Sequence, residues 1–304
     1  MEQKYCDLHI HTSYSDGQRD VENLLEYAIQ KILTKLSITD HDCVDAYFEI
    51  ANKNLAKKYG CEILVGCEFA CVVCGVPIEI LGYGFDLEPI KKYLDKNGFP
   101  QSRRDRMHCQ NFVNIAKSLG IEVDFDYDRD YKNCQKDMKF SAFFADLLKF
   151  PEFYDALQKQ DPEFVKKYSN FMRFGINNPN SIFYQNSAQV FPTAKTIVDI
   201  IHKHGGLCFL AHPYQYGENM TNVLEALKDI VDGVECYHFT SQDFQRQQIL
   251  FDFCNKNNVM KSGGSDYHFI VDPKGCKDKL NEFCVPESYF DEILKNVKGK
   301  KPLV

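Results

Sequence analysis

The stretch Asp7–Gly17 reads DLHIHTSYSDG and places two of the chain's nine histidines one residue apart, at the end of a short apolar segment. In an extended strand, residues two positions apart point to the same side, so His9 and His11 can direct their imidazoles at one point. Asp16 follows five positions after His11, in a polar segment that predicts a turn. The stretch therefore predicts a strand that ends in a cluster of polar ligands.

Short apolar runs alternate with helical patterns along most of the chain. The pattern predicts strands at 5–10, 35–39, 62–65, 207–210, 233–236 and 259–261. It predicts helices at 21–31, 45–59, 193–204, 223–229 and 242–257. Alternating strands and helices indicate an α/β fold with a parallel sheet and helical crossovers, open or closed, and we favour a closed barrel.

The alternation stops between about residues 97 and 191, where the sequence becomes helical, aromatic and charged, as in SAFFADLLKFPEFYDALQKQDPEFVKKY. The turn-forming segments KNGFP and INNPNS bound this block. The pattern predicts a helical insertion subdomain at 98–191 within a barrel domain formed by 1–97 and 192–304.

The composition is that of a folded protein, with 44% hydrophobic and 26% charged residues. No apolar stretch has the length of a signal peptide or of the ~18 residues that span a bilayer. The 13 cysteines are scattered in apolar segments, which favours reduced thiols and a cytoplasmic location. Cys71 and Cys74 form a CxxC with no second pair, so we interpret them as strand and turn residues. The net charge of −7 disfavours long nucleic acids but allows a small site for one phosphate group.

Polar side chains follow the other expected strands as well. They are Asp40 and His41 in TDHD, Glu68 in GCEF, His212 in AHP, and Asp266 and His268 in GGSDYH. The carboxyl ends of parallel strands form one rim, where barrel enzymes place their active sites, so we expect these side chains to converge. Imidazoles and carboxylates suit zinc, manganese or iron, and the number of candidate ligands indicates two or three divalent ions.

The remaining histidines differ from these. His108 falls in a helical stretch, and His202 and His204 lie in the last turn of an expected helix, where positive charge is favourable. We interpret these three as structural. His238 comes two residues after the expected strand 233–236, and we give it a role in binding the substrate.

The motifs DLHIHTSYSDG, ITDHD, GCEF, AHP and GGSDYH, in this order, resemble those of the PHP (polymerase and histidinol phosphatase) family. The similarity is to its stand-alone metal-dependent phosphoesterase branch, and it covers residues 5–85 and 193–270. This resemblance implies a distorted TIM-like barrel of seven strands and helices, (β/α)7, with a helical insertion and up to three metal ions at its rim.

The resemblance also implies a ligand set. One ion would be bound by His9, His11, Glu68 and Asp266, a second would share Glu68 and take His212, and a third would use Asp16, His41 and His268. Glu68 would then bridge two ions, and His268 would face the phosphate oxygens. The residues expected to act in catalysis are Glu68, Asp266, His268 and Asp40, the last by orienting a ligand such as His9 or His41.

The sequence departs from the family pattern at two places. Members of this branch usually have a histidine where PIEILGYG has Glu79, which is either a second-site ligand that favours a harder ion or a salt-bridging glutamate. The insertion reads KFSAFFADLL where related nucleotide phosphatases have an RPH segment. The arginines that could replace this phosphate contact, or else be solvated surface charges, are Arg103, Arg104, Arg106 and Arg173.

A group of two or three divalent ions can activate water and hold phosphate oxygens. The expected activity is hydrolysis of a phosphomonoester, a nucleotide or another small phosphorylated metabolite, by metal-activated hydroxide. An exonuclease or oligonucleotide phosphodiesterase is the second interpretation, and a histidinol-phosphate phosphatase is the third. A non-catalytic metal-binding regulatory module is the fourth, and metal without turnover of any phosphoester would identify it.

Overall fold

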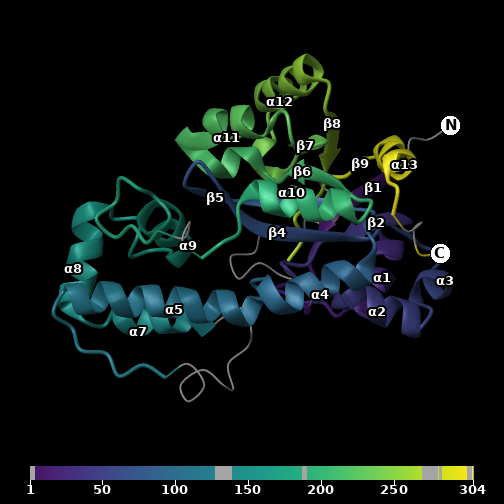
Figure 1. Cartoon of the computed structure of the whole chain (residues 1–304). Coiled ribbons are helices and arrows are strands. Elements are labelled where there is room, and N and C mark those ends of the chain that lie inside the picture. Colours follow the sequence, from purple (N-terminus) through teal and green to yellow (C-terminus); the bar gives the residue numbers. More distant parts are fainter. Residues whose placement is uncertain are drawn as a thin grey trace. The chain divides into compact units, whose positions relative to one another are not determined.

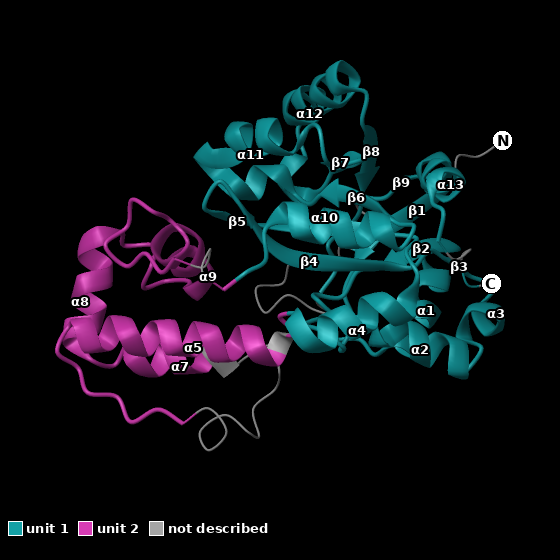
Figure 2. Cartoon of the chain, in the orientation of Figure 1, with its two compact units in different colours: residues 1–98, 191–304 teal, residues 99–190 magenta. Residues whose placement is uncertain are grey.

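The computed structural model describes residues 4–126, 139–186, 190–268, 280, 283–299 and 303 (Figure 1). The chain divides into two compact units, one formed by residues 1–98 and 191–304 and the other by residues 99–190 (Figure 2). The described strands all belong to unit 1, and so do all the predicted metal ligands. Unit 1 therefore contains the candidate site.

Unit 1 is built on two sheets. The four-stranded sheet has the order β3 (Glu62–Ile63), β2 (Lys35–Ile38), β1 (Tyr5–Ile10), β9 (Val285–Pro286). The five-stranded sheet has the order β4 (Gly66–Val73), β5 (Val76–Tyr83), β6 (Leu207–Leu210), β7 (Gly233–Tyr237), β8 (Met260–Gly263). The pairs β1–β2, β2–β3, β6–β7 and β7–β8 are parallel, whereas β1–β9, β4–β5 and β5–β6 are antiparallel.

The predicted α/β class is confirmed, but the prediction of a parallel sheet is wrong for β4 and β5, which form an antiparallel hairpin. The hairpin turns at Cys74 and Gly75, whose φ angles of 51° and 77° suit a tight two-residue turn. In the described part of the chain the strands do not close into a barrel. Single parallel bridges, from Ile10 to Tyr267 and from His41 to Glu68, link residues at the ends of the two sheets.

Helices pack on both sheets. They are α1 (Val21–Gln30), α2 (Asp45–Asn52), α3 (Leu55–Tyr59), α4 (Leu87–Asn97), α10 (Ala194–Lys203), α11 (Met220–Leu227), α12 (Phe244–Asn257) and α13 (Glu287–Asn296), with short 3-10 turns η4 (Pro213–Asn219) and η5 (Phe239–Ser241). Figure 1 shows α10 lying along the larger sheet, where it contacts β4, β5 and β6. In the same way α12 contacts β7 and β8, and α13 contacts β1 and β2.

The sequence explains where these helices begin and end. Thr193 caps α10 because its side chain accepts a hydrogen bond from the backbone N of Thr196 at 3.2 Å. The face that α10 buries carries Ala194, Ile197, Val198 and Ile201. The single helix expected at 45–59 is instead two helices, because Asn54 adopts a left-handed conformation with φ of 50°.

Unit 2 is helical in its described residues. Its elements are α5 (Gln101–Ser118), α7 (Lys139–Leu147), α8 (Pro151–Gln160), α9 (Tyr168–Asn170) and the π-helix η2 (Phe171–Ile176). Phe171 is fully buried at the centre of its core, with ring centroids between 5.3 and 6.4 Å from those of Phe112, Phe144, Phe153, Phe164 and Phe183. Unit 2 therefore has an aromatic core of its own.

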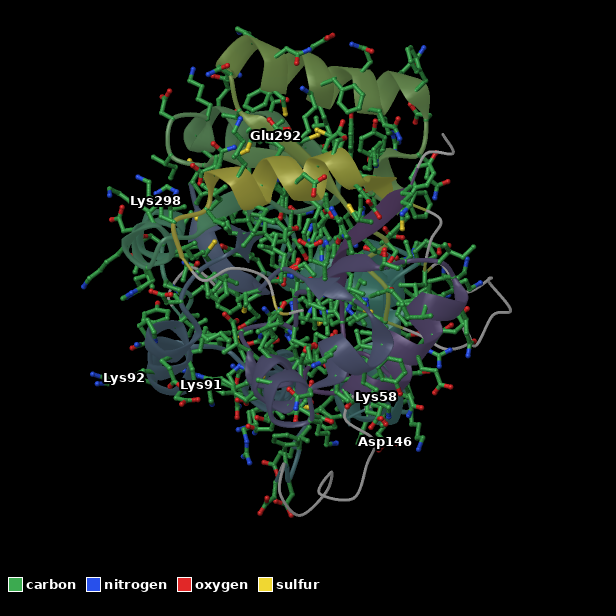
Figure 3. The ribbon with its side chains drawn as sticks, turned by 90° about the vertical axis from the view of Figure 1, so that its right-hand side faces the viewer. Lys58, Lys91, Lys92, Asp146, Glu292 and Lys298 are labelled. Carbon is green, nitrogen blue, oxygen red and sulfur yellow. The ribbon has the colours of Figure 1, made fainter. Side chains whose placement is uncertain are left out.

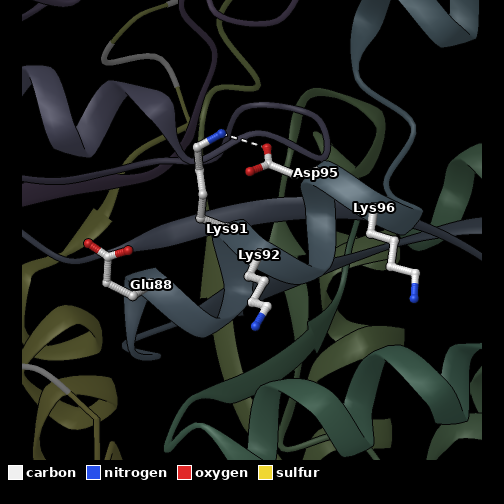
Figure 4. A pocket seen from close by; sticks show the side chains of 5 residues that line it. All are labelled: Glu88, Lys91, Lys92, Asp95 and Lys96. Carbon is white, nitrogen blue, oxygen red and sulfur yellow. Dashed lines mark hydrogen bonds and ion pairs between the residues drawn. The ribbon is translucent and has the colours of Figure 1, made fainter.

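An open hollow on the surface of α4 is lined by Glu88, Lys91, Lys92, Asp95 and Lys96 (Figure 4). Lys91 donates to Asp95 at 2.6 Å and lies 3.1 Å from Asp45 of α2, whereas Figure 3 shows Lys92 projecting away from the ribbon. The hollow contains none of the predicted site residues. No helix in the described ranges is both long and apolar enough to cross a membrane, and the described cysteines form no disulfide.

Candidate metal centre

The first two predicted ligands stand at the end of β1, and both are fully buried. The backbone N of His9 donates to Oδ1 of Asp7 at 3.2 Å, and the backbone N of His11 donates to the carbonyl of Tyr267 at 3.0 Å. Gly264 packs so closely that a Cβ there would lie 2.4 Å from the backbone N of His9, so only glycine fits. The hydrogen bonds to Asp7 and Tyr267 and the close packing of Gly264 therefore fix the backbone of His9 and His11.

Two imidazole nitrogens and two carboxylate oxygens face one another at the end of β1. Nε2 of His9 lies 3.4 Å from Oε2 of Glu68 and 3.4 Å from Oδ1 of Asp266. Nε2 of His11 lies 3.3 Å from each of the same two oxygens. Neighbouring ligand atoms that lie about 2.1 Å from one ion are about 3.0–3.4 Å apart. Each of the two histidines is therefore close enough to both carboxylates to share one divalent ion with them.

The facing atoms of this set make no hydrogen bond, although Oε2 of Glu68 also lies 3.0 Å from Nδ1 of His41. Nε2 of His9, Nε2 of His11 and Oε2 of Glu68 are buried and make no hydrogen bond. Buried polar atoms are almost always satisfied, because an unsatisfied one costs about 1–3 kcal/mol. A cation shared by the three atoms would satisfy them.

A second set lies on the other side of Glu68. This residue lies inside β4 and not, as expected, in the turn at the end of the strand 62–65. Oε1 of Glu68 lies 2.9 Å from Nε2 of His212, and Oε2 of Glu79 lies 3.4 Å from the same nitrogen. His41 completes the set, with Nδ1 3.3 Å from Oε1 of Glu79. Glu79 therefore faces two imidazoles inside the cluster, and its role as a ligand of the second ion stays a prediction.

The third set surrounds Asp16. Its Oδ1 lies 3.2 Å from Nε2 of His268 and 3.7 Å from Nδ1 of His11, and its Oδ2 lies 3.6 Å from Nε2 of His41. These four residues offer ligand atoms that all lie within 4.8 Å of one another. Nδ1 of His268 is 2.8 Å from the carbonyl of Asp266, which leaves Nε2 to face the set. His41 and His11 each have one ring nitrogen near Asp16 and the other near a different set. The expected ligand sets did not assign either histidine to two ions.

Two of these residues have unusual backbone conformations. His212 has a φ of 28° and Asp266 a φ of 51°, in the left-handed region that residues other than glycine rarely adopt. Such strain costs of order 1–3 kcal/mol and is concentrated at functional sites. Both side chains belong to the cluster, which agrees with a functional arrangement.

The charges of the cluster are strongly coupled. Burial disfavours the charged form, but the carboxylates of Glu235, Glu68 and Asp266 raise the pKa of His9 well above its usual value. Against the same burial, Glu68 and Glu79 raise the pKa of His212 to about 10. Burial likewise opposes ionisation of Glu68, but His9 and His41 hold its pKa well below the usual range. Without metal, protons balance the carboxylates, and metal binding would displace these protons.

His238 is also buried beside the cluster. Its Nδ1 accepts a hydrogen bond from the backbone N of Thr240 at 3.2 Å, so Nε2 carries the hydrogen and donates to Oδ2 of Asp266 at 3.2 Å. Oδ1 of Asp266 is then directed at His9 and His11. These contacts favour a role in orienting Asp266 over the expected contact with a substrate.

Asp40 was expected to orient His9 or His41, but its hydrogen-bond partners are other residues. Asp40 accepts hydrogen bonds from the backbone N of Thr12 at 2.7 Å, the hydroxyl of Thr12 at 2.6 Å and the hydroxyl of Ser15 at 2.6 Å. Its carboxylate instead stabilises the turn between His11 and Asp16 through these hydrogen bonds. Asp40 thus supports the site through the backbone of that turn.

Sequence reasoning missed Glu235. This residue lies in β7, is fully buried, and contacts both Nδ1 of His9 and the backbone N of His212. The sequence carried a signal for it, because GVECY places a glutamate inside an otherwise apolar strand. A buried carboxylate requires partners, but the sequence does not say which ones.

The four arginines predicted to contact phosphate lie in unit 2, three on α5 and Arg173 on η2. Nε of Arg104 donates to the carbonyl of Phe99 at 3.0 Å, and the guanidinium of Arg103 lies 4.1 Å from the ring centroid of Phe99. The phosphate contact of Arg103, Arg104, Arg106 and Arg173 stays a prediction.

Comparison with known proteins adds the family. A family model described as the PHP domain matches residues 7–172, more than half of the chain. A 5'-3' exoribonuclease of Haemophilus influenzae is 26% identical over 279 residues, covering 88% of this chain and 91% of that protein. A phosphoribosyl 1,2-cyclic phosphate 1,2-diphosphodiesterase of Eggerthella lenta is 25% identical over 272 residues, covering 86% and 93%.

Solved structures share the fold. A protein of Bifidobacterium adolescentis described as a metal-dependent phosphoesterase superposes with a TM-score of 0.66 at 19% identity, covering 99% of each chain. An amidohydrolase of Chromobacterium violaceum, solved with bound sulfate and no metal, has a TM-score of 0.67 at 21% identity, covering 96% of each chain. At these identities the similarity establishes the fold alone.

Proposed function

This chain belongs to the PHP domain family and is a metal-dependent hydrolase of phosphoric esters, and we propose that it acts on a phosphomonoester of a nucleotide or another small metabolite. We further propose that His9, His11, Asp16, His41, Glu68, Glu79, His212, Asp266 and His268 hold two or three divalent ions. The observation that carries this is the set of four distances of 3.3–3.4 Å between two histidines and two carboxylates.

When bound, such ions would lower the pKa of a bound water to about 7. They would also provide positive charge that stabilises the phosphate oxygens. In this scheme Glu68 is shared, because Oε2 lies 3.3 Å from Nε2 of His11 and 3.0 Å from Nδ1 of His41, and Oε1 lies 2.9 Å from Nε2 of His212. His9, His11 and Asp266 complete the first set, and His212 and Glu79 the second. Asp16 and His268 form the part of the centre where the phosphate would be held. The mixture of imidazole and carboxylate donors suits zinc, manganese or iron.

The charge of the chain supports a small substrate. A net charge of −7 disfavours a long polyanion, whereas the ions supply local positive charge for one phosphate group. Of the two relatives described above, one is named an exoribonuclease and the other a diphosphodiesterase. These names make hydrolysis of a phosphodiester, in a cyclic phosphate or at the end of a short oligonucleotide, the second candidate.

The test combines metal analysis with a substrate panel. Metal-loaded protein would be assayed on nucleoside monophosphates, bisphosphates, cyclic phosphates, short 5'-phosphorylated RNA and histidinol phosphate. We expect turnover of a small ester, and loss of both metal and turnover in His9→Ala and Asp266→Ala. His204→Ala, outside the cluster, is the matched control. Full activity in His9→Ala would contradict the scheme, and metal binding without turnover of any ester would favour the regulatory module.

A further inference from the structure

Glu235 uses both of its carboxylate oxygens inside the protein. Oε1 lies 2.8 Å from Nδ1 of His9, and Oε2 accepts a hydrogen bond from the backbone N of His212 at 2.7 Å. We propose that Glu235 is a positioning residue that orients one ligand of each of the first two ion sites. The inference rests on the metal centre proposed above and adds a residue that links its two halves.

The contact with His9 selects a tautomer. Both oxygens of a carboxylate accept hydrogen bonds, and in the proposed arrangement Nδ1 of His9 carries the hydrogen that faces Oε1. The lone pair of the neutral ring is then on Nε2, the atom that lies 3.4 Å from Glu68 and from Asp266. A carboxylate behind a histidine fixes the ring orientation and raises its basicity toward a metal. Glu235 thereby directs His9 at the first ion.

The contact with His212 acts through the backbone. His212 has a φ of 28° and a ψ of 63°, a strained conformation that surrounding contacts must maintain. Oε2 of Glu235 satisfies its buried N–H, and the ring then places Nε2 2.9 Å from Oε1 of Glu68. Glu235 thus holds a ligand of the second ion in place, and the two contacts together connect the first ion to the second.

Substitutions at Glu235 form a graded series. Glutamine keeps one acceptor oxygen but turns the other position into an N–H donor, which would face the donor of either His9 or His212. Methionine has a similar length and provides no comparable acceptor. Glu235→Gln therefore disturbs one contact, and Glu235→Met disturbs both.

The experiment is calorimetric titration of the metal-stripped full chain with Mn²⁺, with elemental analysis of bound metal and thermal unfolding of each variant. We expect Glu235→Gln to weaken one of the first two sites about 10–100-fold and Glu235→Met to weaken both by about 10–100-fold. The matched controls are Glu225→Gln and Glu225→Met, because Glu225 is an exposed glutamate paired with Lys228. Wild-type affinity at either site in folded Glu235→Met would overturn the proposal.

A measurement on the unmutated protein covers the case in which Glu235→Met does not fold. In zinc-loaded wild-type protein, ¹⁵N NMR of the histidine rings should show His9 protonated at Nδ1 and metal-bound at Nε2. A hydrogen on Nε2 would overturn the proposal. Failure of the wild type to bind any divalent ion would instead contradict the metal centre itself, so the two failures are distinct.

Discussion

Oε1 of Glu68 lies 2.9 Å from Nε2 of His212, although 144 positions separate the two residues in the chain. The other oxygen of Glu68 lies 3.3 Å from Nε2 of His11 and 3.4 Å from Nε2 of His9. A single carboxylate therefore belongs to two donor sets at once. The consequences of removing it differ from those of removing any ligand of one set.

Glu68→Gln should disturb two ion sites together. The amide keeps one oxygen and replaces the other with a donor that cannot ligate a cation. We expect the bound metal to fall by more than one ion per chain and the activity to fall at least about 100-fold, more than for a residue that only supports a ligand. Elemental analysis and a phosphoesterase assay measure both, with Glu225→Gln as control. Loss of one ion alone would show that Glu68 is not shared.

Glu79 should set the metal preference of the second site. A carboxylate favours harder ions than an imidazole does, so Glu79→His is expected to shift the preference from Mn²⁺ or Fe²⁺ toward Zn²⁺. Competition titrations with Mn²⁺ and Zn²⁺ measure this shift directly, without an activity assay. Glu225→His controls for adding a histidine on the surface. An unchanged Mn²⁺ to Zn²⁺ affinity ratio would place Glu79 outside the ligand set.

Metal binding should release protons. The pKa of His9 is raised well above its usual value and that of His212 is raised to about 10, which favours the protonated form of both rings without metal. A ligating imidazole must be neutral, so the affinity should rise with pH up to these pKa values, about tenfold per pH unit for each proton released. Calorimetry in two buffers of different ionisation enthalpy counts the protons. Heats that do not depend on the buffer would contradict the protonated state.

Asp40→Ala should destabilise unit 1. The substitution leaves the backbone N and hydroxyl of Thr12 and the hydroxyl of Ser15 without their buried acceptor. We expect the free energy of unfolding to fall by about 3 kcal/mol, and ion affinity at the Asp16 set to fall with it. Denaturant unfolding measures the first and titration the second. The exposed Asp252→Ala should change the free energy of unfolding by less than about 0.5 kcal/mol; an equal effect of both would contradict the role of the turn.

Phe171→Ala should test whether unit 2 is a separate domain, as we propose from its own aromatic core. Removing this buried ring is expected to cost about 3–5 kcal/mol in unit 2. Calorimetry should then show a transition at lower temperature, while titration shows unchanged ion binding by unit 1. The neighbouring Phe174 is 48% exposed, so Phe174→Ala is the matched control. If ion binding were lost together with the folded structure of unit 2, the proposal that the two units are independent domains would be contradicted.

The sequence predicted well where local geometry determines the outcome. His9 and His11 face one point because a strand alternates its side chains. The ends of the strands expected at 5–10, 35–39, 207–210 and 259–261 also contribute residues to one cluster, whereas Glu68 lies inside β4. The antiparallel hairpin of β4 and β5 was missed, although Cys74 and Gly75 form the kind of turn that joins antiparallel strands. Runs of apolar residues alone do not reveal the direction of a strand.

Long-range contacts explain the remaining differences. Asp40 and Glu235 were not assigned their partners, because a carboxylate can bond any donor within reach and only the folded chain determines which one is near. His41 was assigned to one ion, yet its two nitrogens face different donor sets. The closed barrel is not found, because the described strands form two sheets joined by single bridges.

The order of the ligand candidates along the chain has a consequence for biosynthesis. Unit 2 lies in sequence between Glu79 and His212, and the last candidates are Asp266 and His268. A nascent chain acquires its residues in order, at about 5–20 per second, and unit 2 emerges before half of unit 1 has been made. The proposed first donor set requires Asp266, so its ion would be bound only after unit 2 and most of unit 1 have been synthesised. With the proposed ligands, metal acquisition would therefore be a late step of maturation, and the growing chain would present His9, His11 and Glu68 in an incomplete site until Asp266 has been made.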